Sequence, residues 1–357
     1  MRHGHEMSAV LSDMNVATTA SSRSEGVWHA AWRRLRADRV GIFCMAVVAA
    51  FLLLMLLSGT GLVASNWSRE VAVPNAQPTF MGPTPKDATS AIAGPTGPNV
   101  DLTDIDPLAP RYKEWAERAA KFQTTDTVKA DTLVFGADRL GRNVLSKAVK
   151  GAEVSILVGL LAAVVATLIG TVLGAISGFF GGKIGDLLEW VYNVFTAIPG
   201  ILLIFAFAVI FGRGVMSVAM ILGLAGWTGI YRLIRAEFMK HAVRDYVRSA
   251  EAIGASQMSR MFKHILPNVS HVALVQLSLH VVGFIKSEVI LSYLGLGVGV
   301  DQVSWGTMLA EAQSELILGY WWQLAAVTAF MAVFVTAFSL FTDALRDALD
   351  PKLRGLE

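Results

Sequence analysis

Long apolar runs without charge constrain the fold of this chain more than any other feature. Residues 41–64 and 155–182 contain no Asp, Glu, Lys or Arg. About 20 helical residues cross the roughly 30 Å of bilayer hydrocarbon, so each run is long enough to span a membrane. Only 16% of the 357 residues are charged, against roughly 25% in a soluble domain. The chain is therefore predicted to be an integral membrane protein.

Six membrane-spanning helices are predicted, which makes the fold an all-α integral membrane protein. The predicted spans are residues 41–64, 155–182, 190–212, 214–231, 272–296 and 316–342. A cleaved signal peptide is the alternative for the first run, but its apolar core is too long and the tail before it too extended. Pro199 lies within the third span and is expected to kink it, because proline cannot donate the helical hydrogen bond.

The spans divide the chain into five parts. Residues 1–24 are polar and without periodicity, which predicts a disordered tail. The other parts are residues 25–65 (a basic amphipathic stretch and the first span), 66–130 (a proline-rich lobe), 131–345 (the core with helices 2–6) and 346–357 (a second tail).

The lobe is expected to contain one helix. Pro110 can start a helix over residues 111–122, because proline suits the first helical turn. The helix would carry on one face Tyr112, Trp115, Ala119 and Phe122. Aromatic residues at this spacing indicate a small packed unit within the lobe.

Lysine and arginine are distributed unevenly between the loops, and this asymmetry predicts the orientation of the chain. The loop between the fourth and fifth spans carries Arg232, Arg235, Lys240, Arg244, Arg248, Arg260 and Lys263. No lysine or arginine occurs between Lys286 and Arg346. We therefore expect the basic loop and both termini in the cytoplasm, and the lobe outside it.

The basic loop contains a predicted helical hairpin over residues 246–268. Gly254 can end a first short helix in the left-handed conformation, and Ser256 is a suitable N-cap for a second. The second helix would carry one apolar stripe of Met258, Met261, Phe262 and Ile265. Pro267 suits the first turn of the next helix. The stripe could meet a partner protein or lie in the membrane interface.

This hairpin resembles the EAA loop of ATP-binding-cassette importer permeases, the element that docks on the ATPase subunit. Ala250, Gly254, Leu266 and Pro267 match the family pattern, whereas Arg248, Ser249 and His264 depart from it. Residues 233–238, 287–297, 304–309 and 343–354 are similar to the dipeptide/oligopeptide branch of the family. So is the segment before the second span, which matches at Gly136, Asp138, Gly141, Arg142, Val144, Leu145 and Ser146.

The resemblance implies a multi-pass permease subunit of the C type in a bacterial inner membrane, without enzymatic activity of its own. It implies as partners a second homologous permease subunit, two ABC ATPase subunits, an extracytoplasmic solute-binding protein and membrane lipid. ATP and Mg would be bound by the ATPases, and no cofactor by this chain. Peptides are the implied solute, with nickel chelates and other small solutes in the same branch. The resemblance assigns ATPase coupling to Ala250, Gly254, Ala255, Ser256, Met258, Met261, Phe262, Leu266 and Pro267.

Motifs for other chemistry are missing from the sequence. The string nearest to a phosphate-binding loop, GGKIG at residues 181–185, has Ser177 in place of the first glycine and Ile184 in place of the hydroxyl residue. No nucleophile elbow, HExxH helix or metal-binding cluster occurs, and Cys44, the single cysteine, excludes an intrachain disulfide. A net charge of +2 gives no basic excess for binding nucleic acid.

Three glycines in the second span are candidates for helix packing. Gly170, Gly174 and Gly178 recur every four residues. This small-xxx-small pattern lets two helices approach closely.

The fifth span carries the candidate residues of a translocation pathway. Gln276, His280 and Ser287 share one helical face, with Glu288 at its edge. Glu288 either lines the cavity or fixes a neighbouring helix, whereas Lys286 could equally snorkel to the interface. An ion-coupled secondary transporter is the alternative function. It would need buried acids in several spans and inverted repeats, whereas Glu288 is the only firm acid within a predicted span.

Overall fold

The structure is a computed structural model that describes residues 27–83, 107–119 and 129–349. The predicted tail of residues 1–24, most of the second tail and much of the lobe lie outside the described residues. Within these residues, four helices are long and apolar enough to cross a membrane: α3 (Arg39–Gly59), α6 (Val144–Phe180), the continuous helix Gln257–Tyr293 and α15 (Trp322–Leu349). Two pairs of consecutive helices, each bent by more than 40° at a short break, are also long and apolar enough when each pair is counted as one span. With these pairs the structure has up to six spans.

Each bent pair has a short break between its two helices. In the third predicted span, α7 (Gly182–Ala197) and α8 (Gly200–Phe211) meet at 92°. Pro199 caps α8, so the expected kink is confirmed, but it is sharp enough for a broken span or a re-entrant loop. In the fourth, α9 (Val215–Gly226) and α10 (Thr228–Ala242) meet at 45° around Trp227.

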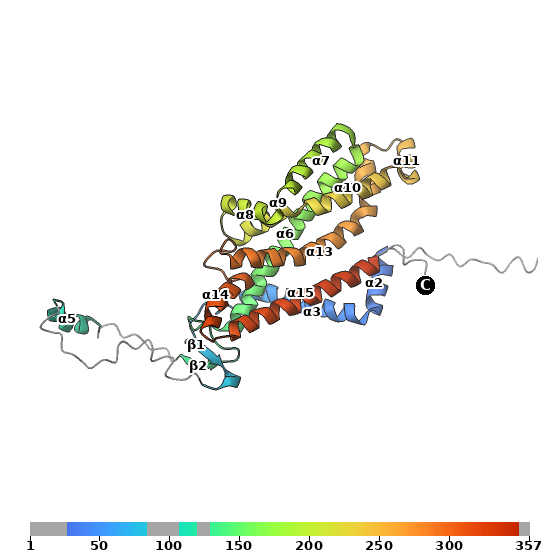
Figure 1. The fold of residues 1–357 in the computed structure, drawn as a ribbon. Helices are drawn as coiled ribbons and strands as arrows, with labels where there is room; N and C mark the ends of the chain where they lie inside the picture. The colour runs from blue at the N-terminus through green and yellow to red at the C-terminus, as the bar shows by residue number, and fades with distance from the viewer. Residues whose placement is uncertain (1–26, 84–106, 120–128, 350–357) are drawn as a thin grey trace, which may run out of the picture.

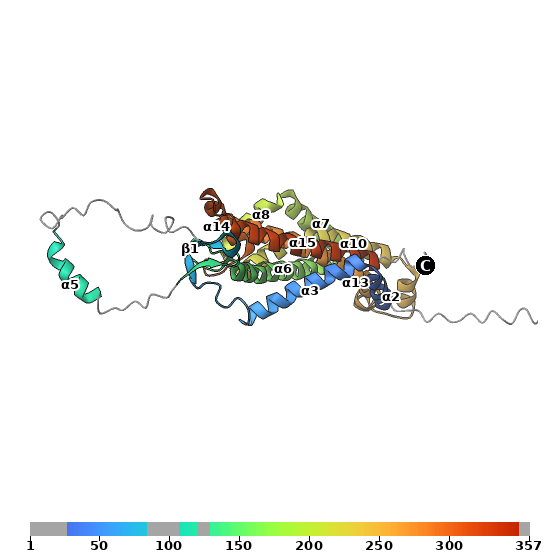
Figure 2. The same cartoon turned by 90° about the horizontal axis from the view of Figure 1, so that it is seen from below.

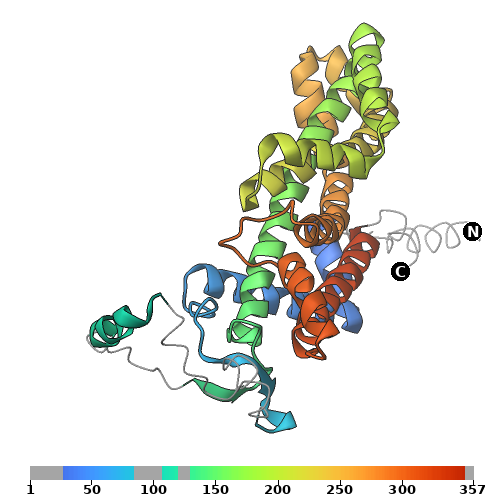
Figure 3. The same ribbon diagram turned by 60° about the vertical axis from the view of Figure 1, so that its left-hand side comes forward.

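Helix α6, with 37 residues, forms the centre of the bundle (Figures 1 and 3). It packs against α10, α13 (Leu266–Tyr293), α9, α3 and α15. It begins at Asn143, whose side chain accepts hydrogen bonds from the amides of Leu145 and Ser146, as an N-cap should. Small residues give this helix close neighbours: a Cβ on Gly159 would clash with Ile285 of α13, and one on Gly223 of α9 would clash with Val165 of α6.

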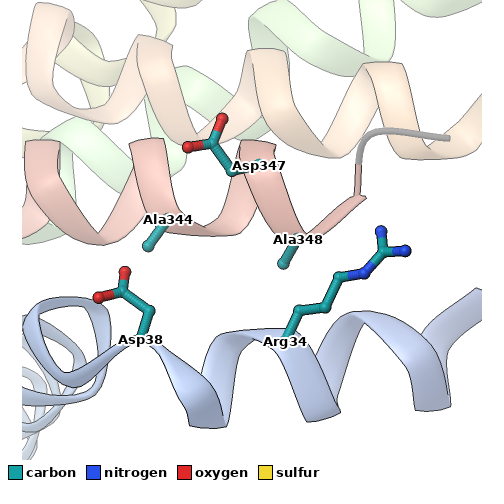
Figure 4. A pocket seen from close by; sticks show the side chains of 5 residues that line it. All are labelled: Arg34, Asp38, Ala344, Asp347 and Ala348. Atoms are coloured by element: carbon teal, nitrogen blue, oxygen red, sulfur yellow. The ribbon is translucent and has the colours of Figure 1, made fainter. Parts of the chain in front are cut away.

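The N-terminal helix folds back onto the end of α15. Helix α2 (Val27–Ala37) is followed by Asp38, which caps α3 by accepting a 3.0 Å hydrogen bond from the Val40 amide. Figure 2 shows α3 approaching the end of α15, with α2 beside the place where they meet. A cavity of about 280 Å³ remains between them, lined by Arg34, Asp38, Ala344, Asp347 and Ala348 (Figure 4). The two chain ends of the described core therefore lie on the same side of the bundle.

The all-α expectation is wrong in one region, where two strands precede α6. Strand β1 (Ala72–Pro78), followed by the short helix η2 (Thr79–Met81), pairs in parallel with β2 (Ala130–Leu133). Parallel pairing across such a long connection leaves no local signal in either strand. Gly141 (φ +78°) closes the turn before α6, where its carbonyl accepts from the amides of Val71 and Ala72 at 3.0 Å. The expected boundary at residue 130 therefore falls at the start of a strand of this sheet.

Of two further helices, one was predicted and one was not. Helix α5 (Ala109–Ala119) starts as expected next to Pro110, and the rings of Tyr112 and Trp115 lie 5.9 Å apart, while Phe122 lies outside the described residues. A short helix, α14 (Trp305–Ile317), precedes α15 and was not predicted. Its Ser304 cap forms a capping box with Thr307. Because α14 occupies these residues, the sixth span begins at Trp322 instead of residue 316.

Candidate functional site

The predicted hairpin lies at one end of the bundle, where α10 and α13 emerge (Figure 1). Its first helix is α11 (Asp245–Ala252), and Gly254 follows with φ +88°, the left-handed conformation that favours glycine. The amide of Ala255 closes the turn on Ala250 O at 2.9 Å. Ser256 then caps the second helix by accepting from the Ser259 amide at 3.3 Å. The expected roles of Gly254 and Ser256 in the backbone are confirmed.

The second helix of the hairpin is not a separate element. It starts as α12 (Gln257–Ser259), passes through a π-helical turn, η3 (Arg260–Ile265), and continues into α13 without a break. Pro267 stands in the first turn of α13. A π turn inserts one extra residue per turn, so it rotates the side chains that follow it.

The single apolar stripe expected on this helix is therefore wrong. Met261 and Ile265 point inward, with 1% and 0% of their surfaces exposed, whereas Met258 and Phe262 are 56% and 50% exposed. Residues four apart share a helical face, so the four residues form two pairs on different faces. One pair anchors the hairpin to the bundle, and the other faces outward.

The outward pair is part of an apolar surface that the prediction covered only partly. Val243, at the end of α10, and Ile253, at the end of α11, are also 63% and 85% exposed. We call the surface of Val243, Ile253, Met258 and Phe262 the loop surface. Of the remaining predicted coupling residues, Ala250 is buried in the inner face of α11, Ala255 and Leu266 are half-buried, and Pro267 is exposed. Ile253 could have been found, because it immediately precedes the glycine that ends α11.

Contacts beneath the loop surface hold it in place. Arg260 of η3 pairs with Glu251 of α11 at 2.7 Å, and its guanidinium lies 5.8 Å from the ring of Phe179 at the end of α6. His241 Nδ1 and the Tyr246 hydroxyl are 2.8 Å apart, which joins the end of α10 to α11. The hairpin is thus attached to both α6 and α10. Exposed basic residues surround it: Lys240, Arg244, Arg248 and Lys263.

The three glycines of α6 lie where α10 crosses it. A Cβ on Gly174 would stand 2.7 Å from Tyr231 O, and one on Gly178 2.5 Å from Arg235 O. For Gly170 the nearest atom is Ile230 Cβ, also at 2.7 Å. Real Cβ atoms do not approach backbone oxygens this closely, so any larger residue would push α10 away.

A polar cluster fixes α7 to the same helix pair. The Tyr231 hydroxyl donates to Ser177 Oγ at 2.9 Å, and Arg235 Nε donates to the same oxygen at 3.0 Å. Arg235 also pairs with Glu189 of α7 at 3.3 Å. Tyr192 of α7 stacks on Tyr231 with ring centroids 5.3 Å apart. Helices α6, α7 and α10 are therefore joined near the hairpin by side chains as well as by close packing.

The fifth-span candidates differ in burial. Gln276, His280 and Ser287 are half-buried, and Lys286 is exposed. The His280 ring stacks on Phe284 at 5.3 Å, and Ser287 Oγ donates to Gly283 O at 3.1 Å.

Glu288 turns away from that face and is fully buried. Its Oε1 accepts from Ser292 Oγ at 2.6 Å, and Ser292 Oγ in turn accepts from the Val298 amide at 3.4 Å. The geometry favours the second of its two expected roles, in which it fixes a neighbouring segment. In the described part of the chain no group of three potential metal ligands occurs.

A comparison with protein families and a comparison with individual proteins identify the same family. Residues 170–355 match the family described as binding-protein-dependent transport system inner membrane component. The chain is 31% identical over 351 residues to the glutathione transport system permease protein GsiD of Shigella flexneri, with 97% of each chain covered. It is 33% identical over 247 residues to the oligopeptide transport system permease protein OppC of Bacillus subtilis, covering 69% of this chain and 81% of the relative. It is 28% identical over 322 residues to the dipeptide transport system permease protein DppC of Lactococcus lactis, covering 90% of each.

Proposed function

Because the chain belongs to the family of binding-protein-dependent transport system inner membrane components, we propose that it couples ATP hydrolysis by partner subunits to the import of a small solute. The observation that carries this proposal is the loop surface. Four large apolar side chains are exposed on and next to a hairpin that is attached to the bundle through buried Met261 and Ile265 and through contacts with α6 and α10. An apolar surface on a rigid support is typical of a protein docking site.

The attachments of the hairpin support a mechanical route into the membrane. A push on the loop surface would reach α13 through the continuous helix Gln257–Tyr293, and α10 through the contact of His241 with Tyr246. The close contact of α10 with the glycines of α6 leaves no room for α10 to slide alone. The helices would therefore move as one unit. The energy is the difference in affinity for ATP between the two conformations of the complex.

The finer parts of the proposal rest on the family. The complete importer would contain a second homologous permease subunit, two ABC ATPases and an extracytoplasmic solute-binding protein. If each bent pair is one span, six spans place both termini in the cytoplasm with the basic loop. The relatives are named for dipeptide, oligopeptide and glutathione transport, so we expect a peptide as the solute. The lobe of residues 66–130 would then face the solute-binding protein.

A charge placed on the loop surface tests the docking role. Ile253→Asp should weaken binding of the ATPase subunits about 30-fold, because truncating or charging a central interface residue costs roughly 2 kcal/mol. Val300 offers a matched control, since it is 92% exposed against 85% for Ile253 and lies in the loop between α13 and α14. Val300→Asp should leave binding unchanged.

The measurement is the amount of ATPase that co-purifies with each variant from detergent-solubilised membranes in which the whole complex is expressed. Equal recovery with Ile253→Asp and with the unsubstituted chain would overturn the docking assignment. Loss with both variants would show a general effect of added charge instead of a specific surface.

A further inference from the structure

A buried charge cluster lies at the end of α6 farthest from the loop surface. It consists of Asp138, Arg142, Lys147, Glu311 and Glu315, and we call it the charge cluster. Lys147 Nζ lies 2.7 Å from Asp138 Oδ2 and also contacts Glu311, with 1% of its side chain exposed. Arg142 Nε lies 2.6 Å from the same Asp138 oxygen and its NH2 group 3.3 Å from Glu311. Both cations are thus shared between the same two carboxylates.

The charge cluster joins segments that are far apart in the sequence. Asp138 and Arg142 lie in the turn before α6, Lys147 in the first turn of α6, and the two glutamates in α14. From α15, Gln323 Nε2 donates to Glu311 at 3.2 Å. Asp138 Oδ1 also accepts from the amides of Leu140 and Arg142 at 2.9 Å, which fixes the turn itself. The position of residues 136–143 therefore depends on these charges.

Glu315 is the member whose charge is not balanced. It is 2% exposed, and its Oε1 accepts from the Arg139 amide at 3.0 Å. Its Oε2 has no hydrogen-bond partner among the described residues. Without Glu315, the two carboxylates and two cations of the charge cluster cancel. An ionised Glu315 adds a third negative charge to a buried site, which is costly unless it is paired.

We propose that Glu315 is a proton-binding site whose occupancy holds residues 136–143 against α14. With the proton bound, the charge cluster is neutral, and Glu315 still accepts the hydrogen bond from the Arg139 amide. When the proton leaves, three carboxylates face Lys147 and Arg142, and the loop opens so that water can reach Glu315. The ligand of the site is a proton from the solvent on that side of the membrane.

The electrostatics of the site agree with this assignment. Burial raises the pKa of Glu315 to about 7, against the opposing effects of the Arg139 amide and Lys147. Burial also disfavours the charge on Asp138, but Lys147 and Arg142 outweigh it and hold the pKa of that carboxyl below its usual value. The charged groups facing Glu315 are Asp138 from the loop, Lys147 from α6 and Glu311 from its own helix, and Arg139 contributes its backbone amide. Gln323 from α15 is uncharged.

The sign of the pH effect follows from linkage. The closed loop binds the proton more tightly than an open loop with the ordinary glutamate pKa of 4.5. The closed state is therefore favoured fully below about pH 4.5, and that advantage is lost as the pH rises to about 7. Between pH 6 and pH 8 the open fraction should rise about tenfold.

Hydrogen exchange measured by mass spectrometry on the full-length chain in lipid nanodiscs tests the proposal. The rate of hydrogen exchange in residues 136–143 of the unsubstituted chain is divided, at each pH, by the rate in the Glu315→Gln variant. This ratio should rise about tenfold from pH 6 to pH 8. Division by a variant that cannot lose the proton removes the intrinsic pH dependence of exchange. A constant ratio would overturn the proposal. The readout requires no transport, so it stands apart from the proposed import function.

A control variant and an alternative measurement complete the test. Glu153→Gln is the matched control, because Glu153 pairs with Lys150 of its own helix at 2.7 Å and makes no contact with the charge cluster. It should keep the full pH dependence. If Glu315→Gln does not fold, nitroxide labels at the exposed Leu140 and Ser314 of the otherwise unchanged chain report the same opening. Their separation should increase between pH 6 and pH 8, and an unchanged separation would contradict the proposal.

Discussion

The two ends of the helical bundle carry polar and apolar residues in opposite arrangements. At one end, the loop surface exposes Val243, Ile253, Met258 and Phe262 on and next to the hairpin. At the other, the charge cluster buries Asp138 and Lys147 and pairs them with each other. Exposed apolar groups gain free energy when a partner covers them, whereas buried charges are satisfied only within the fold. Under the proposed function the first end binds a partner protein, whereas the charges at the second end join segments of the chain to one another.

This comparison predicts different consequences for changes at the two ends. Substitutions in the charge cluster should lower the stability of the chain itself. Substitutions on the loop surface should leave the chain folded and affect only its partners.

The largest effect is expected for Lys147→Ala. The change leaves the buried Asp138 and the half-buried Glu311 with Arg142 as their one remaining shared cation among the described residues, and removing one partner of a buried ion pair costs about 3–5 kcal/mol. Thermal unfolding of the purified chain in detergent, followed by a fluorescence assay, should show a lowered midpoint. Lys150→Ala, one turn further along and less buried, is the control and should shift the midpoint little. Equal shifts for both variants would break the comparison.

Gly174→Leu is expected to cost about 3 kcal/mol, since overpacking a close contact forces the backbone to move. Its Cβ would stand 2.7 Å from Tyr231 O, so α10 must separate from α6. The amount of folded chain in the membrane, measured by size-exclusion chromatography, should fall. Gly229→Leu on α10 meets no atom within 4 Å of its Cβ and should be tolerated. Normal yield from Gly174→Leu would mean that the helices can part without loss of the fold.

Gly254→Val should affect coupling more than folding. The residue has φ +88°, and a branched side chain in that region costs roughly 1–2 kcal/mol. No atom lies within 4 Å of its Cβ, so the strain stays within the turn. We expect the protein to remain in the membrane while solute uptake by the complex is lost. Gly254→Asn should retain uptake, because asparagine tolerates the left-handed conformation. Normal uptake by Gly254→Val would contradict a role of this turn in coupling.

Features that depend on local chemistry could be predicted from the sequence. Apolar runs identify the membrane helices because length and hydropathy alone decide whether a segment can span a bilayer. Pro199, Gly254 and Ser256 act through their own backbone conformations, so their effects were visible without knowledge of their neighbours.

Features that depend on distant contacts could not be predicted. The pairing of β1 with β2 and the contact of Lys147 with Glu311 each join segments separated by long stretches of chain. Neither partner carries a signal that names the other. The π turn at residues 260–265 is a small local change, yet it separated Met258 and Phe262 from Met261 and Ile265. The 3.6-residue period assumes an unbroken α-helix, and an inserted residue invalidates it beyond that point.

The smallest effect on stability is expected for Glu288→Gln. Glu288 lies between the two ends of the bundle. It is fully buried and accepts a 2.6 Å hydrogen bond from Ser292, which helps to fix the turn leading to α14. If its role is this hydrogen bond, Glu288→Gln should keep stability within about 1 kcal/mol, because the amide oxygen can still accept. Glu288→Ala should cost more, about 1–3 kcal/mol, since it leaves Ser292 without its acceptor and opens a cavity. Thermal midpoints of both variants, with solute uptake measured alongside, decide the question. Loss of uptake by Glu288→Gln at unchanged stability would show that the charge of Glu288 serves the translocation pathway instead.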